Sequence, residues 1–433
     1  MQRPSTTLRL RHNHRILVAA LVMLSVLGAT GSLTAAAQPS PHLVTTWSAS
    51  PQARWESDFV LPAGVPEALH NHTIRQPLRV SIGGERLRIV LSNAYGERPL
   101  PIADASVAIS AGRDAILPGS ARSVTFGGRR RATIPPGAPL VSDPVDLPVE
   151  PLSMLAVTLH VPEPTPINTF HWDARRTSYI APGQQVRENH LDEARTTTTR
   201  VLLSAVLVEA PKARGAVVAV GDSITDGNGA TTDANARWPD FLAERLAPRD
   251  VAVINAGISG ARLLTDGMGE NALARLRRDV LAPPGVTTAV VLIGINDISW
   301  PGTAFAPYSS RPTLAELTAG YTQLVERAHT HGIRVVGATL PPFKGALEGS
   351  PLDDYYSADK NRLRREINQW LRESEVFDAV VDLDRVLRDP AKPERLRPEF
   401  DSGDHLHPGD EGNRAIAETF TEQALFGEQP TTQ

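Results

Sequence analysis

One short apolar stretch that ends in a polar turn constrains the fold of this chain more than any other feature. Residues 217–220 are all apolar, three of them are valine, and Gly221-Asp222-Ser223 follows at once. Such a run is typical of a strand that is buried on both faces of a parallel sheet. Ligands bind beyond the carboxyl ends of strands in open α/β sheets, which is where this turn places the Ser223 hydroxyl. Taken alone, the stretch fits a nucleophilic serine and an ordinary Gly-Ser turn equally well.

The chain beyond Gly215 alternates apolar strands with helical patterns. The predicted strands are residues 217–220, 251–254, 288–293, 334–339 and 379–383. Apolar residues recur with helical spacing in residues 238–246, 272–281, 314–331 and 358–375. Five strands with intervening helices predict an α/β fold, in which residues 215–427 form a doubly wound, three-layer domain.

The preceding part of the chain has a different pattern, rich in proline, glycine, threonine and valine. Residues 78–82 alternate apolar and polar side chains before Gly83-Gly84. After it, Leu87, Ile89 and Leu91 alternate with Arg88 and Val90, and the two runs together predict a hairpin. Further strand candidates are residues 106–109, 123–126, 155–161 and 201–208. Because amphipathic helices are scarce here, residues 38–210 are predicted to form an all-β sandwich or jelly-roll-like domain. Residues 211–215 are the predicted linker.

The first residues have the composition of a secretory signal peptide. Four arginines precede the almost wholly apolar run 16–27, and Ala35-Ala36-Ala37 offers a cleavage site. Residues 1–37 are therefore predicted to be removed, which makes the mature protein secreted or periplasmic. An uncleaved membrane anchor is the alternative, although the run is short for a membrane span.

Charge and cysteine content exclude several classes of partner and mechanism. Cleavage after Ala37 removes four arginines and no acidic residue, which changes the formal net charge from −4 to −8. An acidic protein is not expected to bind nucleic acid or anionic membrane as its main partner. The chain contains no cysteine, so disulfides, thiol nucleophiles and thiolate metal sites are all excluded.

Polar turns that contain glycine follow the second and third predicted strands as well as the first. They are residues 255–260 and 294–297, and a further polar stretch spans residues 401–408. A serine hydroxyl needs an adjacent base, which His407 can supply near neutral pH. Asp404, three residues earlier, can accept a hydrogen bond from the imidazole and stabilise its charged form. His405 competes with His407 for the role of base.

These four stretches, in this order, resemble blocks I, II, III and V of the SGNH hydrolases, also called the GDSL esterase/lipase family. The resemblance covers roughly residues 215–425 and implies a flavodoxin-like α/β/α sheet. The family pattern Asp-x-x-His selects Asp404 and His407 as partners of Ser223, and it leaves His405 as a structural neighbour. The implied oxyanion hole consists of the backbone N–H groups of Ser223 and Gly260 and the side-chain amide of Asn296. Glycine allows close backbone approach, and an asparagine amide donates without carrying charge.

Other conspicuous residues have interpretations that compete with a direct chemical role. Asp222, Asp297 and Asn255 are expected to hydrogen-bond the backbone of their loops. Arg262 fits a substrate contact and an ordinary surface arginine equally well. Three tryptophans of the β domain fit sugar stacking or, more commonly, core and turn packing; they are Trp47, Trp55 and Trp172.

Neither a metal nor a cofactor is predicted. The pairs His70/His72 and His329/His331 lack carboxylates at ligand spacing. The cluster Asp401, Asp404, His405 and His407 is a better metal candidate, but the serine mechanism accounts for two of its members without a metal. Gly227-Asn228-Gly229 lacks the third glycine of a nucleotide fingerprint.

The predicted function is that of a cofactor-independent serine esterase that forms an acyl-enzyme through Ser223, His407 and Asp404. The architecture resembles that of exported bacterial enzymes that remove acetyl groups from plant polysaccharides such as xylan. The expected substrate is therefore a short-chain acetyl ester, either small or carried on a polysaccharide. A lipase, arylesterase or lysophospholipase is the enzymatic alternative, and a carbohydrate-binding protein with a vestigial hydrolase domain is the non-enzymatic one.

Overall fold

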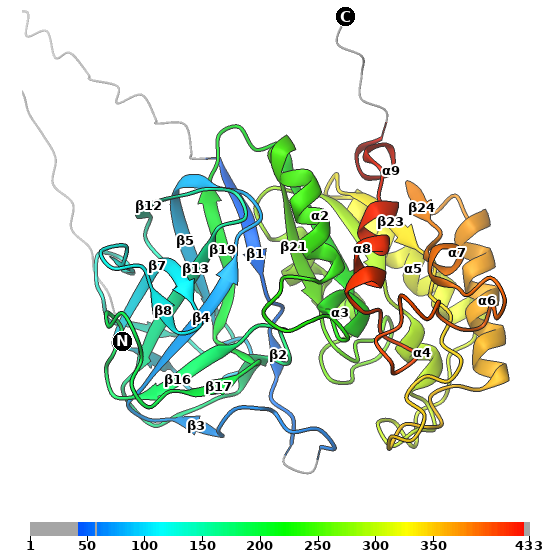
Figure 1. The fold of residues 1–433 in the computed structure, drawn as a ribbon, viewed down its shortest axis with the longest axis horizontal. Helices are drawn as coiled ribbons and strands as arrows, with labels where there is room; N and C mark the ends of the chain where they lie inside the picture. The colour runs from blue at the N-terminus through cyan, green and yellow to red at the C-terminus, as the bar shows by residue number, and fades with distance from the viewer. Residues whose placement is uncertain (1–41, 57–58, 428–433) are drawn as a thin grey trace, which may run out of the picture. The chain divides into compact units, whose positions relative to one another are not determined.

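The apolar stretch at residues 217–220 lies inside strand β20 (Gly215–Gly221) of a five-stranded parallel sheet (Figure 1). The computed structural model describes residues 42–56 and 59–427, so the predicted signal peptide lies outside the described residues. The strand order is β21-β20-β22-β23-β24, and every residue of β20 and β21 is buried. The other strands are β21 (Val251–Gly257), β22 (Val286–Leu292), β23 (Arg334–Ala338) and β24 (Ala379–Val381).

Helices cover both faces of this sheet, which confirms the predicted three-layer α/β class. The connection from β20 to β21 runs toward one edge of the sheet, whereas the later connections to β22, β23 and β24 run toward the other edge. Because β-α-β connections are right-handed, the helices of these two sets lie on opposite faces of the sheet. Helix α2 packs with α8, whereas α3 and α6 pack with α5. The helices are α1 (Ser223–Asp226), α2 (Trp238–Leu246), η1 (Ala247–Arg249), α3 (Ala272–Leu276), η2 (Arg277–Leu281), α4 (Ile295–Ser299), α5 (Leu314–His329), α6 (Ala358–Glu373), α7 (Leu383–Leu387), α8 (Asp410–Thr419) and α9 (Glu422–Phe426).

The strand order creates a crevice at one place on the sheet edge. The chain leaves β20 toward β21 and later returns past β20 to β22, so the order reverses between β20 and β22. Ligands bind at such switch points, beyond the carboxyl ends of the strands. Ser223 follows β20 and Asn296 follows β22, so both lie at this crevice. Among the described helices, none is long and apolar enough to cross a membrane.

The chain before Gly215 folds into antiparallel sheets, which confirms the all-β prediction. The first sheet contains β1 (Leu43–Ser48), β19 (Leu203–Glu209), β5 (Gly84–Ser92), β11 (Pro139–Val141) and β12 (Val145–Val149). The second contains β17 (Arg195–Thr197), β16 (Ser178–Pro182), β4 (His72–Arg79), β13 (Met154–Val161), β7 (Asp104–Gly112), β8 (Ala115–Ile116) and β9 (Arg122–Ser123). Smaller sheets pair β10 (Ala132–Ile134) with β6 (Leu100–Ile102), β14 (Thr165–Pro166) with β3 (Ala68–Leu69), and β15 (Thr169–His171) with β18 (Arg200–Val201) and β2 (Gln52–Ala53). Buried residues of both large sheets share one apolar core.

The hairpin predicted around Gly83-Gly84 is wrong. Strand β4 pairs with β13 and β16, whereas β5 pairs with β19, β11 and β12 of the other sheet. Glycine is needed at both positions because backbone atoms of other strands approach closely, and not because the chain makes a tight turn. A Cβ on Gly83 would lie 2.1 Å from the carbonyl oxygen of Val149, and one on Gly84 would lie 2.6 Å from that of Glu209. The chain therefore crosses from one sheet to the other at this point.

The all-β region and the α/β region pack directly against each other. Strand β1 packs against β21 of the parallel sheet. The Thr45 N–H donates to the carbonyl of Pro284 at 2.9 Å, and the Ser48 hydroxyl donates to that of Asn255 at 2.9 Å. Ala216 and Ala252 of the parallel sheet belong to the core of the all-β region. The described residues form one compact unit, and the domain boundaries 38–210 and 215–427 stay predictions.

Candidate active site

Ser223 is held in a tight turn at the carboxyl end of β20. It is the first residue of α1, so its backbone N–H has no acceptor within the helix. The Asp222 carboxylate caps this helix by accepting a hydrogen bond from the N–H of Ile224 at 3.1 Å. A Cβ on Gly221 would lie 2.5 Å from the carbonyl oxygen of Leu292, so the strand ends pack too closely for any other residue.

The structure brings Ser223, His407 and Asp404 into one hydrogen-bonded chain. The Ser223 Oγ lies 2.8 Å from Nε2 of His407, and His407 Nδ1 lies 2.5 Å from Oδ2 of Asp404. Ser223 is 7% exposed and His407 is 8% exposed, so both groups are reachable from the crevice and shielded from bulk water. A serine, a base in contact with it and a carboxylate that orients the base are the parts of a nucleophilic triad.

Asp404 is held in its charged form by its surroundings. Burial alone would raise its pKa, but the hydrogen bond and charge of His407 together with backbone donors lower the pKa well below its ordinary value. The second carboxylate oxygen accepts from the N–H groups of Leu406 at 3.0 Å and His407 at 2.8 Å. A carboxylate so fixed keeps the imidazole in one orientation.

The predicted oxyanion donors lie at the same crevice as Ser223. Gly260 has a φ of +70°, and a Cβ there would lie 2.5 Å from both the sulfur of Met268 and the Trp300 ring. Glycine is therefore required for backbone conformation and for space. The Asn296 amide donates one hydrogen to the carbonyl of Ala261 at 3.0 Å, which leaves its second hydrogen for another acceptor.

An apolar pocket of about 240 Å³ opens beside these groups. Ser223, Gly260, Asn296 and His407 line part of this pocket. Most of the remaining wall is apolar and comes from Met268, Trp300, Phe305, Leu347, Leu352, Tyr355 and Leu406. The all-β region completes the wall with Val60, Leu61 and Trp172. The site is thus built by both regions of the chain.

Residues 219–415 match the model of the GDSL-like lipase/acylhydrolase family. This segment is a GDSL-like acylhydrolase domain. Among solved structures, the chain is similar to an acetyl xylan esterase from Geobacillus stearothermophilus, with 21% identity over 51% of this chain and 98% of that one and a TM-score of 0.36. It is also similar to a GDSL-like lipase from Bacteroides thetaiotaomicron, with 19% identity over 47% of this chain and 85% of that one and a TM-score of 0.35. No curated protein matches the chain.

The family assignment confirms the predicted enzyme class, a carboxylic ester hydrolase. In the acylhydrolase domain, loop hydrogen bonds account for the remaining polar residues of the turns, as expected. Asp297 accepts from the N–H groups of Leu263 at 2.7 Å and Leu264 at 3.0 Å. Asn255 donates to the carbonyl of Thr225 at 2.7 Å. These bonds tie the polar turns to one another.

Tyr355 was not anticipated from the sequence, because it lies in an irregular segment of the acylhydrolase domain outside every motif. Its hydroxyl donates to the side-chain oxygen of Asn296 at 2.7 Å, which orients the amide. Burial raises the pKa of Tyr355 well above its ordinary value, so the hydroxyl stays protonated and keeps donating. Tyr355 is thus a positioning residue for the third oxyanion donor.

Replacing Tyr355 by phenylalanine is expected to lower kcat about tenfold and leave KM nearly unchanged. The substitution frees the Asn296 amide to rotate, and an oxyanion donor acts mainly in the transition state. Steady-state kinetics on p-nitrophenyl butyrate measures both constants. Tyr356→Phe is the matched control and should retain wild-type kinetics. A Tyr355→Phe enzyme with unaltered kcat would show that the Asn296 amide needs no support.

The buried carboxyl group of Asp222 is expected to make the stability of the acylhydrolase domain depend on pH. Burial, with a smaller contribution from the charge of Asp297, raises the pKa of Asp222 to about 7. Its pKa in the unfolded chain is about 3.9. A raised pKa means that the contribution of Asp222 to stability is fully present below about pH 4 and is lost as the pH rises to about 7.

Asp222→Asn is therefore expected to raise the melting temperature relative to wild type more at pH 8 than at pH 5. Asparagine carries no charge at either pH, and its side-chain oxygen can still cap the N–H of Ile224. The difference between the two pH values corresponds to about 1 to 4 kcal/mol in the free energy of unfolding. Thermal denaturation of both proteins at both pH values measures it. Parallel pH dependence in the two proteins would contradict a buried, titrating Asp222.

Most of the other residues that the sequence singled out lie outside the Ser223 site, and Trp172 is an exception. His405 pairs with Asp401, with Nδ1 2.5 Å from Oδ2, and makes no contact with Ser223. Arg262 is 7% exposed, so its interpretation as a surface arginine is wrong; it lies over the Trp300 ring and lines a different pocket. Trp47 is a core residue, whereas Trp172 lines the Ser223 pocket. In the described part of the chain, no three His, Asp or Glu side chains are grouped as metal ligands.

Proposed function

We propose that the chain is a serine esterase in which Ser223 is the nucleophile, His407 the general base and acid, and Asp404 the carboxylate that orients His407. The observation that carries this proposal is the unbroken contact from Ser223 Oγ through both ring nitrogens of His407 to Asp404. Each group has the chemistry that its role requires.

The reaction proceeds in two steps. The Ser223 oxygen attacks the ester carbonyl while its proton passes to Nε2 of His407, and the resulting oxyanion accepts hydrogen bonds from Ser223, Gly260 and Asn296. Collapse of this intermediate expels the alcohol, which takes the proton from His407. Water then attacks the acyl-enzyme with His407 as base, and the free acid and Ser223 are released.

We propose further that the substrate is an ester of a short or medium-length apolar acyl group. The apolar wall beside Ser223 supports an apolar group in preference to a hydroxyl-rich one. The pocket volume of about 240 Å³ is small for a ligand site, since such sites typically measure about 300–1,000 Å³. That volume suits butyryl or hexanoyl esters better than long lipid chains.

Acyl-chain preference tests this assignment. With p-nitrophenyl acetate, butyrate, hexanoate, octanoate and dodecanoate, kcat/KM is expected to peak at butyrate or hexanoate and to fall at least about tenfold at dodecanoate. A maximum at dodecanoate would instead indicate a lipase. A maximum at acetate, together with acetate release from acetylated xylan, would favour the polysaccharide deacetylase expected from the sequence.

Export of the mature protein is part of the proposal and rests on residues 1–37 alone. The N-terminal sequence of protein recovered from the medium or periplasm of an expressing bacterium is expected to begin at Gln38. Recovery in the membrane with an intact N-terminus would favour the uncleaved anchor.

A further inference from the structure

A buried carboxylate that takes no part in the proposed reaction lies behind the nucleophile turn. Asp226 is the last residue of α1 and has no exposed surface. Its Oδ2 accepts two hydrogen bonds from Ser259, one from the backbone N–H at 2.9 Å and one from the hydroxyl at 2.8 Å. Ser259 immediately precedes Gly260, whose N–H is a proposed oxyanion donor. Asp226 therefore holds Ser259 in place, and with it the adjoining backbone N–H of Gly260.

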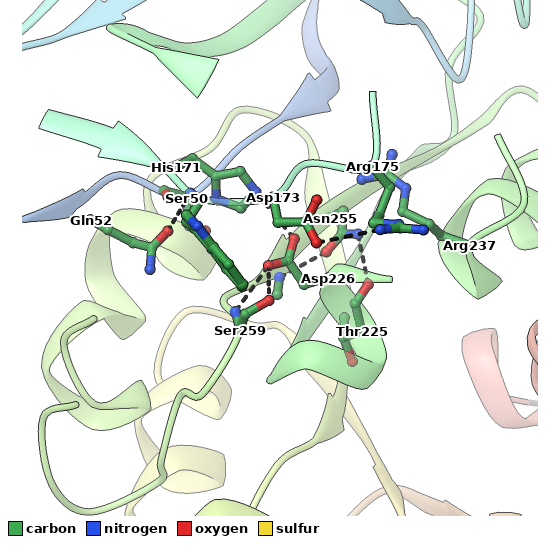
Figure 2. A network of polar contacts seen from close by, with 12 residues as sticks. Ser50, Gln52, His171, Asp173, Arg175, Thr225, Asp226, Arg237, Asn255 and Ser259 are labelled. Atoms are coloured by element: carbon green, nitrogen blue, oxygen red, sulfur yellow. Dashed lines mark hydrogen bonds and ion pairs between the residues drawn. The ribbon is translucent and has the colours of Figure 1, made fainter. Parts of the chain in front are cut away.

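The other oxygen of Asp226 faces a histidine from the all-β region (Figure 2). Nε2 of His171, the last residue of β15, lies 3.1 Å from Oδ1 of Asp226. Nδ1 of the same ring lies 3.0 Å from the carbonyl oxygen of Ser50. Both ring nitrogens face oxygen atoms, so the imidazole ring links the Asp226 carboxylate to the backbone of the all-β region. His171 is buried, which makes this link strong and directional.

The all-β region also holds the far end of the same loop. The side-chain amide of Gln52 and the indole N–H of Trp55 both donate to the carbonyl of Met268, at 2.9 Å and 2.8 Å. The sulfur of Met268 occupies the space next to Gly260 where a Cβ would otherwise fit. The loop from Ser259 to Met268 is thus held by the all-β region at both ends.

We propose that His171 is a positioning residue for ester hydrolysis. Through Asp226 it holds Ser259 and Gly260 where the Gly260 N–H meets the oxyanion, which makes the all-β region part of the catalytic apparatus and not a separable binding module. This inference rests on the proposed esterase function. A shift of about 1 Å in a positioning group can cost about a hundredfold in rate.

Two substitutions of His171 separate this role from simple packing. The amide nitrogen of glutamine matches the position of Nε2 and can still donate to Asp226, whereas that of asparagine matches Nδ1 and reaches only toward Ser50. On p-nitrophenyl butyrate, His171→Asn is expected to lower kcat about 10- to 100-fold with KM changed less than about threefold. His171→Gln is expected to restore kcat to within about fivefold of wild type, and the pH profile of kcat/KM should keep its shape in both.

A buried histidine of the same region provides the matched control. Nε2 of His160 on β13 lies 3.0 Å from the side-chain oxygen of Asn71, so His160→Asn also removes a buried Nε2 contact. This control should retain wild-type kcat. Equal kcat values for His171→Asn, His171→Gln and wild type would overturn the proposal, as would equal losses in both His171 variants at equal melting temperatures.

If both His171 variants unfold, Ser259→Ala tests the same link from the other side. It removes one of the two bonds to Asp226 and is expected to lower kcat about three- to tenfold at constant KM, and an unchanged kcat would overturn the proposal. The esterase function itself is judged separately. Wild-type protein without activity would contradict the esterase function. Active wild-type enzyme together with a fully active Ser259→Ala variant would contradict only the role of His171.

Discussion

Ser223→Ala is expected to lower kcat for p-nitrophenyl butyrate about 10⁴- to 10⁶-fold. Alanine removes the only atom that bonds to the acyl group, and the remaining oxyanion donors give a small residual acceleration. The fold should be retained, because among the described side chains the Ser223 hydroxyl hydrogen-bonds only to His407. Initial rates at saturating substrate, with protein of equal melting temperature, measure the effect.

Two outcomes would contradict a serine mechanism. Equal rates in wild type and Ser223→Ala would show that another group or another protein in the preparation hydrolyses the ester. A loss confined to KM would show that Ser223 binds substrate without reacting with it, because loss of the nucleophile must appear in kcat.

Asp404→Asn is expected to lower kcat about 10⁴-fold while the fold remains intact. Asparagine presents an amide where the His407 ring needs an acceptor at Nδ1, so the ring is held in the wrong tautomer or loses its support. The wild-type enzyme should not lose this interaction at mildly acidic pH, because the pKa of Asp404 is lowered well below its ordinary value. Its contribution to stability is therefore present above about pH 4 and disappears only as the pH falls through the lowered pKa.

Asp401 provides a matched control for this substitution. Asp401 contacts Nδ1 of His405 at the same 2.5 Å separation that joins Asp404 to His407. Asp401→Asn should change kcat less than about fivefold, since the His405 ring makes no contact with Ser223. If Asp401→Asn were the more damaging variant, His405 would be the base and the assignment of His407 would be wrong.

Much of the α/β region could be predicted because its signals are local. Residues 238–246 match α2 at both ends, since Pro239 and the helical spacing mark the start and the amphipathic pattern marks the length. The valine-rich runs likewise fall within or largely overlap β20 to β22, because strands buried on both faces consist mostly of apolar residues. The short helices α7 and α9 have too few turns to leave a periodic signal.

Pairing in the all-β region could not be predicted, because it depends on contacts distant in sequence. The turn at Gly83-Gly84 has the local pattern of a hairpin, yet close approach of Val149 and Glu209 gives the glycines their actual role. The residues of the candidate site show the same difference between local sequence signals and contacts distant in sequence. Ser223 and His407 belong to local sequence motifs that can be recognised without a structure. Tyr355 and His171 belong to no such motif and are brought to the site only by tertiary packing.

Covalent labelling tests the central claim, that Ser223 is the nucleophile, most directly. A fluorophosphonate ester reacts with an activated serine and leaves a stable phosphonyl group in place of the acyl group. After treatment of the wild-type enzyme and digestion, mass spectrometry is expected to find one phosphonyl group per chain on the peptide that contains Ser223, with loss of esterase activity in equal proportion. Stoichiometric inactivation with the label on any other residue, or full activity after labelling of Ser223, would contradict this account.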